Sequence, residues 1–442
     1  MIFSSIEFII FFILFLVLVK IFKNYQKQII IASSLFFYAY WNPIFIFVVI
    51  YLCLITYLLI KNKINLKFSV IVVLLPLFYF KYSLFLFKYI PIEFFDYFSY
   101  RGELPLAISF ISFTAIAILI DIKNKTFNEN LTFVNFSEFI LYFPQLIAGP
   151  ILRAKELIPQ LKNKIILKKE NIKFGIFLFS IGFIKKIFFA DNIALLIDPI
   201  FENPQLFTSK DLIKGFLLFP LQIYFDFSGY VDMALGISGL LGIDLPVNFK
   251  KPYLTHSLTD FWRSWHITLS SWFRDYVYIP LGGSRVNKIK MYFNLVFTMT
   301  IAGLWHGASI NFIIWGFLNG LFLSLEKKLD FKLKKNSLRV IINCFIIFNL
   351  WLIFRITEMS SLIDYFYKIY SNLSGILIIE NLLILIVVCF AIYSQKFEDQ
   401  KKIKQFSSKL SLVTLLPFFI ILLITGFAIS TGQSDKFIYF DF

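Results

Sequence analysis

Long apolar runs separated by short basic clusters make up most of the chain. A helix that spans a lipid bilayer needs about 20 consecutive apolar residues, and eight runs reach or approach that length. The pattern predicts a membrane-spanning helix in each of these runs, which are Ile6–Phe22, Phe68–Lys88, Leu104–Ile120, Phe174–Ala190, Leu212–Leu241, Val340–Arg355, Gly375–Tyr393 and Ser411–Ser430.

Two further runs, Ile29–Ile60 and Met291–Leu325, are too long for one span. Proline removes a helix donor, so we expect the first run to break at Trp41-Asn42-Pro43. We expect the second to break at Trp305-His306-Gly307. Each run is interpreted as a hairpin of two spans, which brings the total to eleven or twelve crossings. The short run Phe133–Gly149 joins two basic loops and is predicted to be re-entrant.

The basic clusters orient the predicted spans, because lysine and arginine accumulate on the cytoplasmic side of membrane proteins. The clusters assigned to the inside are Lys20 to Lys27, Lys61 to Lys67, Arg153 to Lys173, Lys250 to Lys290, Lys327 to Arg339 and Lys396 to Lys409. The acidic or mixed segments assigned to the outside are Pro91–Glu103, Asp191–Asp211 and Thr357–Asn372. This alternation places both termini outside.

The start of the chain lacks the basic stretch of a cleaved signal peptide. No segment between the apolar runs is long enough to fold as a soluble domain. We therefore expect residues 1–442 to form one polytopic membrane domain. The expected fold is all-α, with about 11–12 transmembrane helices supplemented by re-entrant and interfacial amphipathic helices.

Composition excludes a soluble fold. Apolar residues make up 59% of the chain and charged residues only 16%, against about 45–50% and about 25% in soluble domains. The net charge of +16 would suggest nucleic acid in a soluble protein, but here the basic residues lie between apolar runs. Nucleic-acid binding is therefore not expected. The three cysteines, Cys53, Cys344 and Cys389, lie inside apolar runs without metal-ligand or disulfide spacing.

The segment Lys250–Arg285 is too polar to span the membrane, yet it is rich in tryptophan. At about 100° per residue, a helix from Trp262 gathers Trp265, His266, Leu269, Trp272 and Phe273 on one side, with Arg263 and Arg274 together beside them. This pattern is typical of an amphipathic helix at the inner membrane surface. Two interpretations stay open: the aromatic side packs into the interface, or His266 faces a pore or cavity.

His306 lies between two apolar half-spans, far from any charge and flanked by Gly303 and Gly307. An ionisable residue at membrane depth is costly and by default marks a functional site. Imidazole is the cheapest such group, because it can stay neutral near pH 7 and still accept a proton. The alternative is a structural histidine hydrogen-bonded inside a helix bundle.

Other chemistry finds less support. Paired histidines can ligate haem, but His266 and His306 lie in different kinds of segment, and no paired metal-binding carboxylates occur. We therefore expect neither metal nor haem. Asp226 and Asp232, at the end of a predicted span, can form a proton path or bond to Ser228 or an arginine; the structural role is favoured.

Several ordered motifs closely resemble the bacterial membrane-bound O-acyltransferase (MBOAT) family, in its alginate and peptidoglycan O-acetylation branch. The motifs cover residues 143–150 with Arg153, 221–236, 245–253, 260–266, 272–283, 303–308, 312–316 and the tail 437–442. The resemblance covers essentially the whole chain and is densest over residues 104–320. One departure is Asp441, where the branch more often has glutamine.

The resemblance implies a helix bundle around a narrow central channel, with His306 as the catalytic residue and His266 as its companion. It implies acyl transfer from a cytoplasmic thioester, acetyl-CoA, to a hydroxyl handled outside. A histidine in a dry channel can act as general base on that hydroxyl, with backbone N–H groups or Trp305 as donors to the developing oxyanion. The residues expected to bind the donor are Lys250, Lys251, Arg263, Trp265, Arg274 and Arg285, and those expected to shape the channel are Asp226, Asp232, Trp305 and Asn311.

The tail of residues 431–442 presents Tyr439 in an aromatic stretch. Similar tails in this branch imply an acyl-relay tyrosine that serves a periplasmic transferase of the SGNH type; an aromatic anchor at the membrane interface is the alternative. The expected location is the bacterial inner membrane. The expected acceptor is peptidoglycan, then alginate or another exported polysaccharide. Competing functions are D-alanyl transfer from a carrier protein and a non-enzymatic channel or flippase.

Overall fold

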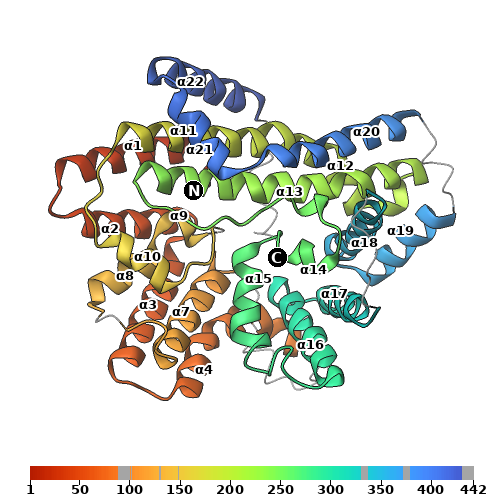
Figure 1. Cartoon of the computed structure of the whole chain (residues 1–442), viewed down its shortest axis with the longest axis horizontal. Coiled ribbons are helices and arrows are strands. Elements are labelled where there is room, and N and C mark those ends of the chain that lie inside the picture. Colours follow the sequence, from red (N-terminus) through yellow and green to blue (C-terminus); the bar gives the residue numbers. More distant parts are fainter. Residues whose placement is uncertain are drawn as a thin grey trace. The chain divides into compact units, whose positions relative to one another are not determined.

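A computed structural model describes residues 1–87, 100, 102–128, 131–147, 149–329, 337–371 and 379–430. Within these residues every regular element is a helix, so the predicted all-α fold is confirmed (Figure 1). The tail of residues 431–442, with Tyr439 and Asp441, lies outside the described residues. The chain forms two compact units.

Unit 1 comprises Met1–Ile181, Tyr230–Pro246 and Ser407–Phe427. Its helices are α1 (Ile6–Ile21), α2 (Gln26–Ala39), η1 (Pro43–Phe45), α3 (Ile46–Lys61), α4 (Leu66–Leu77), η2 (Phe78–Tyr82), α5 (Ser83–Phe87), α7 (Ile108–Lys123), α8 (Phe133–Leu141), α9 (Phe143–Leu146), α10 (Ala154–Leu161), most of α11 (Lys169–Phe183) and most of α22 (Leu412–Ile429). The last part of α13 (Ser209–Leu240) also belongs to this unit.

Unit 2 comprises Gly182–Gly229, Val247–Phe406 and Ala428–Phe442. Its helices are η3 (Ile184–Ala190), α12 (Asp191–Glu202), η4 (Pro204–Leu206), the first part of α13, η5 (Pro252–Leu254), α14 (Leu258–Trp262), α15 (Ile267–Phe273), η6 (Arg274–Tyr278), α16 (Lys288–His306), α17 (Ile310–Leu329), α18 (Ser337–Arg355), α19 (Met359–Ser371), α20 (Ile379–Ser394), η8 (Gln395–Phe397) and most of α21 (Gln400–Lys409).

Five helical stretches in the described part of the chain are long and apolar enough to cross a membrane. They are Pro43–Lys61, Leu66–Leu86, Ser337–Arg355, Ile379–Phe397 and Leu412–Ile429. Each coincides with a predicted span. The other predicted spans also form helices, while the total of eleven or twelve crossings stays a prediction, as does the single membrane domain.

Both long runs break where the sequence predicts. In the first, Asn42 accepts a hydrogen bond from the backbone N–H of Ile44 through its side chain, and Pro43 begins the short helix η1. In the second, α16 ends at His306 and α17 begins at Ile310. The run Phe133–Gly149 forms only the short helices α8 and α9, which are too short to span a bilayer.

One predicted helix is wrong. The amphipathic helix expected from Trp262 is interrupted: α14 ends at Trp262 and α15 begins at Ile267. Between them His266 adopts a left-handed backbone conformation, with φ of 42°. Such a residue cannot continue a right-handed helix, so the aromatic side chains belong to two short helices.

The hairpin of α16 and α17 is closely packed through glycines (Figure 1). A Cβ added to Gly303 would lie 2.1 Å from the backbone oxygen of Phe312, and one added to Gly316 would lie 2.3 Å from that of Met299. Small residues allow helix backbones to approach this closely in membrane proteins. The position of His306 at the end of α16 therefore depends on α17.

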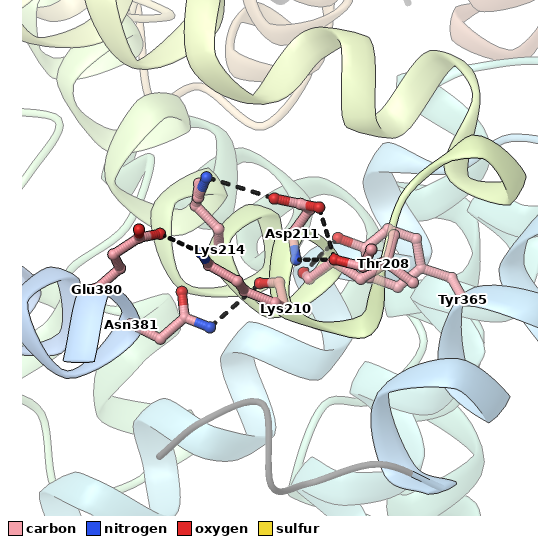
Figure 2. A network of polar contacts seen from close by, with 8 residues as sticks. Thr208, Lys210, Asp211, Lys214, Tyr365, Glu380 and Asn381 are labelled. Carbon is pink, nitrogen blue, oxygen red and sulfur yellow. Dashed lines mark hydrogen bonds and ion pairs between the residues drawn. The ribbon is translucent and has the colours of Figure 1, made fainter. Parts of the chain in front are cut away.

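A polar network fixes the start of α13 in unit 2 (Figure 2). The hydroxyl of Thr208 donates to a carboxylate oxygen of Asp211 over 2.7 Å. The hydroxyl of Tyr365 on α19 donates to the backbone oxygen of Leu212 over 2.7 Å. Lys210 forms an ion pair of 2.5 Å with Glu380 on α20. These contacts tie three helices of the unit together.

Candidate active site

Among the described residues, four aromatic rings lie around the imidazole of His306. Its ring centroid lies 4.7 Å from that of Trp305, 4.9 Å from Phe354 and 5.2 Å from Trp315, all at steep interplanar angles. Phe312 lies 6.3 Å away. Edge-to-face contacts of this kind favour defined ring orientations. Because only 6% of His306 is exposed, the imidazole is enclosed and oriented by its neighbours.

The indole of Trp305 lies near both predicted histidines. Its ring centroid is 6.4 Å from that of His266 and 4.7 Å from that of His306. Phe227 on α13 packs edge-on against His266 at 4.7 Å. The structure thus brings the two histidines, far apart in the sequence, into one aromatic cluster.

The strained backbone of His266 is held by Asn248. The backbone oxygen of Asn248 accepts a hydrogen bond of 3.0 Å from the N–H of Ile267. Its side-chain oxygen accepts one of 3.0 Å from the N–H of Thr268. A left-handed conformation costs about 1–2 kcal/mol, and such strain persists only where the surroundings determine it, often at functional sites.

His266 is only 1% exposed, and burial lowers its pKa to about 3. Near neutral pH the imidazole therefore carries no charge. A neutral ring cannot attract the phosphates of a donor by its charge. This environment favours a role for His266 in positioning neighbouring groups.

A cavity of about 340 Å³ opens beside His306. On α17 its lining includes Trp315, Leu323 and Lys327, which span twelve residues, or about 18 Å of helix. The lining residues on α16 are Leu295, Thr298, Met299, Ala302 and His306. The cavity is therefore elongated and largely apolar, and the histidine forms part of its wall.

Three cations line the same cavity. The exposed side chain of Arg263 lies 3.8 Å from Asp260, and that of Arg274 pairs with Asp275 at 2.8 Å. The third cation is Lys327, whose pKa is lowered by burial and by nearby Arg263. Exposed guanidinium and ammonium groups are the protein groups that bind phosphate most strongly.

The other predicted donor-binding residues lie elsewhere in unit 2. Lys250 and Arg285 are exposed, and neither they nor Lys251 are among the described residues that line the cavity. Trp265 is buried, with its ring 4.8 Å from that of Trp351. Their role in donor binding stays a prediction.

The predicted channel residues have mainly structural partners. The Asn311 side chain donates to the backbone oxygen of Ile356 over 2.5 Å, which fixes the start of α17. Asp226 forms a buried ion pair of 2.7 Å with Lys186. The partner is thus a lysine, where the sequence suggested Ser228 or an arginine. Asp232 belongs to unit 1, and Tyr439 lies outside the described residues.

Several residues of the site were given no role by the sequence. Asn248 and Trp315 lie in motifs that carry the family resemblance and Phe354 lies in a predicted span, but none of them was expected to hold a histidine. Lys327 belongs to a basic cluster that was predicted only for orientation. Lys327 follows Trp315 by twelve residues on α17, and both line the cavity. This spacing was the available sign that the two side chains share one side of the helix.

No group of three or more histidine, cysteine, aspartate or glutamate residues in the described ranges is arranged to hold a metal ion. The fold and site instead define an all-helical protein with apolar helices of membrane-spanning length and an enclosed histidine beside an elongated cavity. The chain belongs to the membrane-bound O-acyltransferase family, whose model matches residues 11–363. It is a multi-pass membrane protein.

Relatives act on several polymers. A "probable alginate O-acetylase" of Pseudomonas syringae pv. tomato is 42% identical over 57% of this chain and 49% of its own length. A peptidoglycan O-acetyltransferase of Helicobacter pylori is 35% identical over 76% of this chain and 72% of its own. A teichoic acid D-alanyltransferase of Bacillus subtilis is 31% identical over 50% of this chain and 58% of its own. The chain spans about half the length of the alginate relatives that it matches.

Proposed function

We propose that the protein is an O-acyltransferase in which His306 is the general base for transfer of an acetyl group from acetyl-CoA to a hydroxyl group. The observation that carries the proposal is the placement of His306 in the wall of an elongated cavity that is also lined by Arg263, Arg274 and Lys327. A narrow apolar cavity suits the extended arm of a thioester donor, and the cations suit its phosphates.

The chemistry follows from the enclosed imidazole. A thioester is already activated, so the demanding step is removal of the proton from the attacking hydroxyl. His306 accepts this proton as the hydroxyl oxygen bonds to the thioester carbonyl carbon. The carbon–sulfur bond then breaks, and the leaving thiolate takes the proton from His306. The indole N–H of Trp305 or backbone N–H groups stabilise the transient oxyanion.

His266 acts as a positioning residue in this proposal. It lies in a different sequence motif from the general base, but both imidazole rings lie near the indole of Trp305. Its buried, neutral ring helps to fix the indole and through it His306. The donor reaches the cavity from the cytoplasm, where the positive-inside rule places Arg263, Arg274 and Lys327.

The proposed acceptor is a cell-envelope polysaccharide, peptidoglycan first and alginate or another exported polysaccharide second. Support for peptidoglycan comes from the larger share of this chain, 76%, that its relative matches. We place the protein in the bacterial inner membrane with a periplasmic SGNH-type transferase as partner. Tyr439 is proposed as the acyl relay to that partner, on the resemblance of the tail alone.

The test is acyl transfer by the purified full-length chain in nanodiscs with labelled acetyl-CoA. We expect His306→Ala to lower thioester turnover at least about 100-fold, the scale of general-base catalysis. The control is His256→Ala, which alters a histidine of the same unit that lines a different cavity. This variant is expected to keep near-normal turnover.

Three results would overturn the proposal. Turnover that survives loss of His306 would argue against its role as general base. Transport without acyl transfer would indicate a channel or flippase. Transfer from a D-alanyl carrier protein, with none from acetyl-CoA, would assign the chain to the D-alanyl transferases, to which it is also similar.

A further inference from the structure

A second cavity, of about 360 Å³, lies in unit 1 and shares no lining residue with the cavity at His306. Four lysines line it: Lys23, Lys27, Lys162 and Lys164. Glu138 is the one acidic residue in its lining, so the formal charge is +3 when that carboxyl is ionised. We term this cavity the lysine pocket. The chemistry proposed for His306 makes no use of it.

One wall of the lysine pocket is fixed by the side chain of Gln26. Its amide N–H donates to the backbone oxygen of Ile165 over 3.1 Å, and its amide oxygen accepts from the N–H of Ile165 over 2.9 Å. This reciprocal pair holds the turn that carries Lys162 and Lys164 against α2. Gln26 is buried, which protects both hydrogen bonds from water.

A second glutamine fixes the other end of the same turn. The amide of Gln160 donates to the backbone oxygen of Asp244 over 3.0 Å and accepts from its N–H over 2.9 Å. The turn after α10 is therefore tied on both sides, to Gln26 and to Asp244. Its two lysines project from a backbone that is held in place, which lowers the entropy lost when they bind an anion.

The third side of the pocket is formed by α8, which lies beside α2 and α10 (Figure 1). The ammonium group of Lys27 donates to the side-chain oxygen of Asn135 over 2.7 Å and lies 3.9 Å from a carboxylate oxygen of Glu138. Asn135 and Glu138 are one helical turn apart. They hold the ammonium group of Lys27 at the pocket wall.

Apolar side chains lie next to the pocket at the end of α1. Ile21 and Phe22 are 63% and 50% exposed, and Tyr25 is 61% exposed, on either side of Lys23. Basic pockets beside spanning helices on the cytoplasmic side are typical sites for anionic lipid headgroups. A lipid can place its phosphate in the pocket and its acyl chains along α1.

From this arrangement we propose that the lysine pocket binds a phosphate group, presented by the headgroup of an anionic phospholipid of the inner leaflet. Lys23 and Lys164 supply exposed ammonium groups, and Lys27 supplies an ammonium group that Asn135 and Glu138 hold in place. The exposed apolar side chains of α1 favour a lipid over a soluble phosphate. The proposal concerns binding in unit 1 and does not depend on acyl transfer at His306.

Glu138 makes the binding depend on pH. Burial raises the pKa of Glu138 to about 7, against the opposing effect of Lys27. The other charged groups among the described residues that line the pocket are the lysines at 23, 27, 162 and 164. As the pH falls through 7, the pocket therefore gains one positive charge and an O–H donor, and affinity for the phosphate rises.

Native mass spectrometry of the full-length protein, with phosphatidylglycerol or phosphatidylcholine added to the detergent, tests the proposal. We expect selective retention of phosphatidylglycerol. The variant K23Q/K164Q should lose about 10-fold or more of that affinity, since each lysine near a lipid surface contributes about 1 kcal/mol. The matched control, K61Q/K67Q, removes two exposed lysines of the same unit that are outside the described lining. It removes the same charge but leaves the pocket intact, so it should cost clearly less affinity than K23Q/K164Q.

Two further arms sharpen the result. Competition by inorganic phosphate would support the anion site and identify its source as a soluble phosphate; failure to compete supports the lipid.

Retention should be stronger at pH 6 than at pH 8, and Glu138→Gln should remove this difference. Equal loss in K23Q/K164Q and K61Q/K67Q, or no preference for phosphatidylglycerol, would overturn the proposal. Thermal unfolding of each variant checks that the fold persists.

Discussion

His266 and His306 have the same side chain but different surroundings. His306 lines a cavity that also carries three cations, whereas His266 is 1% exposed and held in a left-handed conformation. The first is placed where a substrate can reach it, and the second is proposed to act through its neighbours. The difference lies in the packing around each ring, which sequence periodicity does not report.

The low pKa of His266 predicts how stability depends on pH. The unfolded chain protonates this histidine with a pKa of 6.5, while the folded protein does so only near 3. Below pH 6.5 the unfolded state therefore binds the extra proton, and folding loses up to about 1.4 kcal/mol per pH unit. We expect the thermal stability of the wild type to fall more steeply from pH 7 to pH 4.5 than that of His266→Asn.

Asparagine suits this comparison because it tolerates the left-handed conformation and does not titrate. Unfolding is followed by intrinsic fluorescence in detergent at each pH. Parallel pH curves for the wild type and His266→Asn would show that the buried imidazole is not the group responsible.

At the residue level the sequence predicted both histidines, Arg263 and Arg274. It predicted His306 because a histidine at membrane depth is costly, and it gave His266, Arg263 and Arg274 their roles through the resemblance to the family. The sequence did not predict Asn248, whose function is to accept hydrogen bonds from a backbone nineteen and twenty residues further on. Such a contact depends on tertiary packing and leaves no local pattern.

Among the elements, the hairpin of α16 and α17 bears most directly on the site. The break between the two helices was predictable from the glycine that follows His306, and the structure confirms it. The break before α15 was not predictable, because histidine as a residue type does not mark the end of a helix. Its left-handed conformation results from the backbone contacts with Asn248.

Close packing in this hairpin predicts the effect of a single methyl group. Gly303→Ala would bring a Cβ within 2.1 Å of the backbone oxygen of Phe312, so α16 and α17 must separate. Overpacking of this kind costs about 1–3 kcal/mol. We expect a lower melting temperature. Because His306 moves with the end of α16, we also expect turnover to fall by more than unfolding of the variant accounts for.

The control is Phe317→Leu on the same hairpin, at a side chain that is 47% exposed. It should change both quantities little. Both are measured on the same nanodisc preparations by thermal unfolding and acetyl-CoA turnover. Wild-type behaviour of Gly303→Ala would contradict the link between hairpin packing and the site.

At the scale of the whole molecule, the class of protein was predictable from the sequence alone. The apolar content and the spacing of basic clusters required a multi-pass helical protein. Length and composition support five of the predicted spans directly. The other predicted spans miss that combination of length and apolar content for different reasons: α1 has only 16 residues, and α13 carries the buried Asp226.

The predicted topology places Lys23 and Lys327 on the cytoplasmic side, although they belong to different units. Cysteines introduced at these positions, after Cys53, Cys344 and Cys389 are replaced by alanine, should react with a membrane-impermeant maleimide only in inverted vesicles. Leu206→Cys, at a position that is 78% exposed, should react only in intact cells. Labelling of Lys23→Cys and Lys327→Cys from different sides would contradict the orientation.

The length of α16 has a consequence for the membrane in which the protein works. From Lys288 to His306 the helix advances eighteen residues, or about 27 Å along its axis, close to the roughly 30 Å thickness of the hydrocarbon layer. Helices respond to a thinner or thicker bilayer by tilting or by deforming the lipid. With Lys288 anchored at one surface, membrane thickness sets how far His306 lies from the other, so we expect the proposed acetyl transfer to depend on lipid composition.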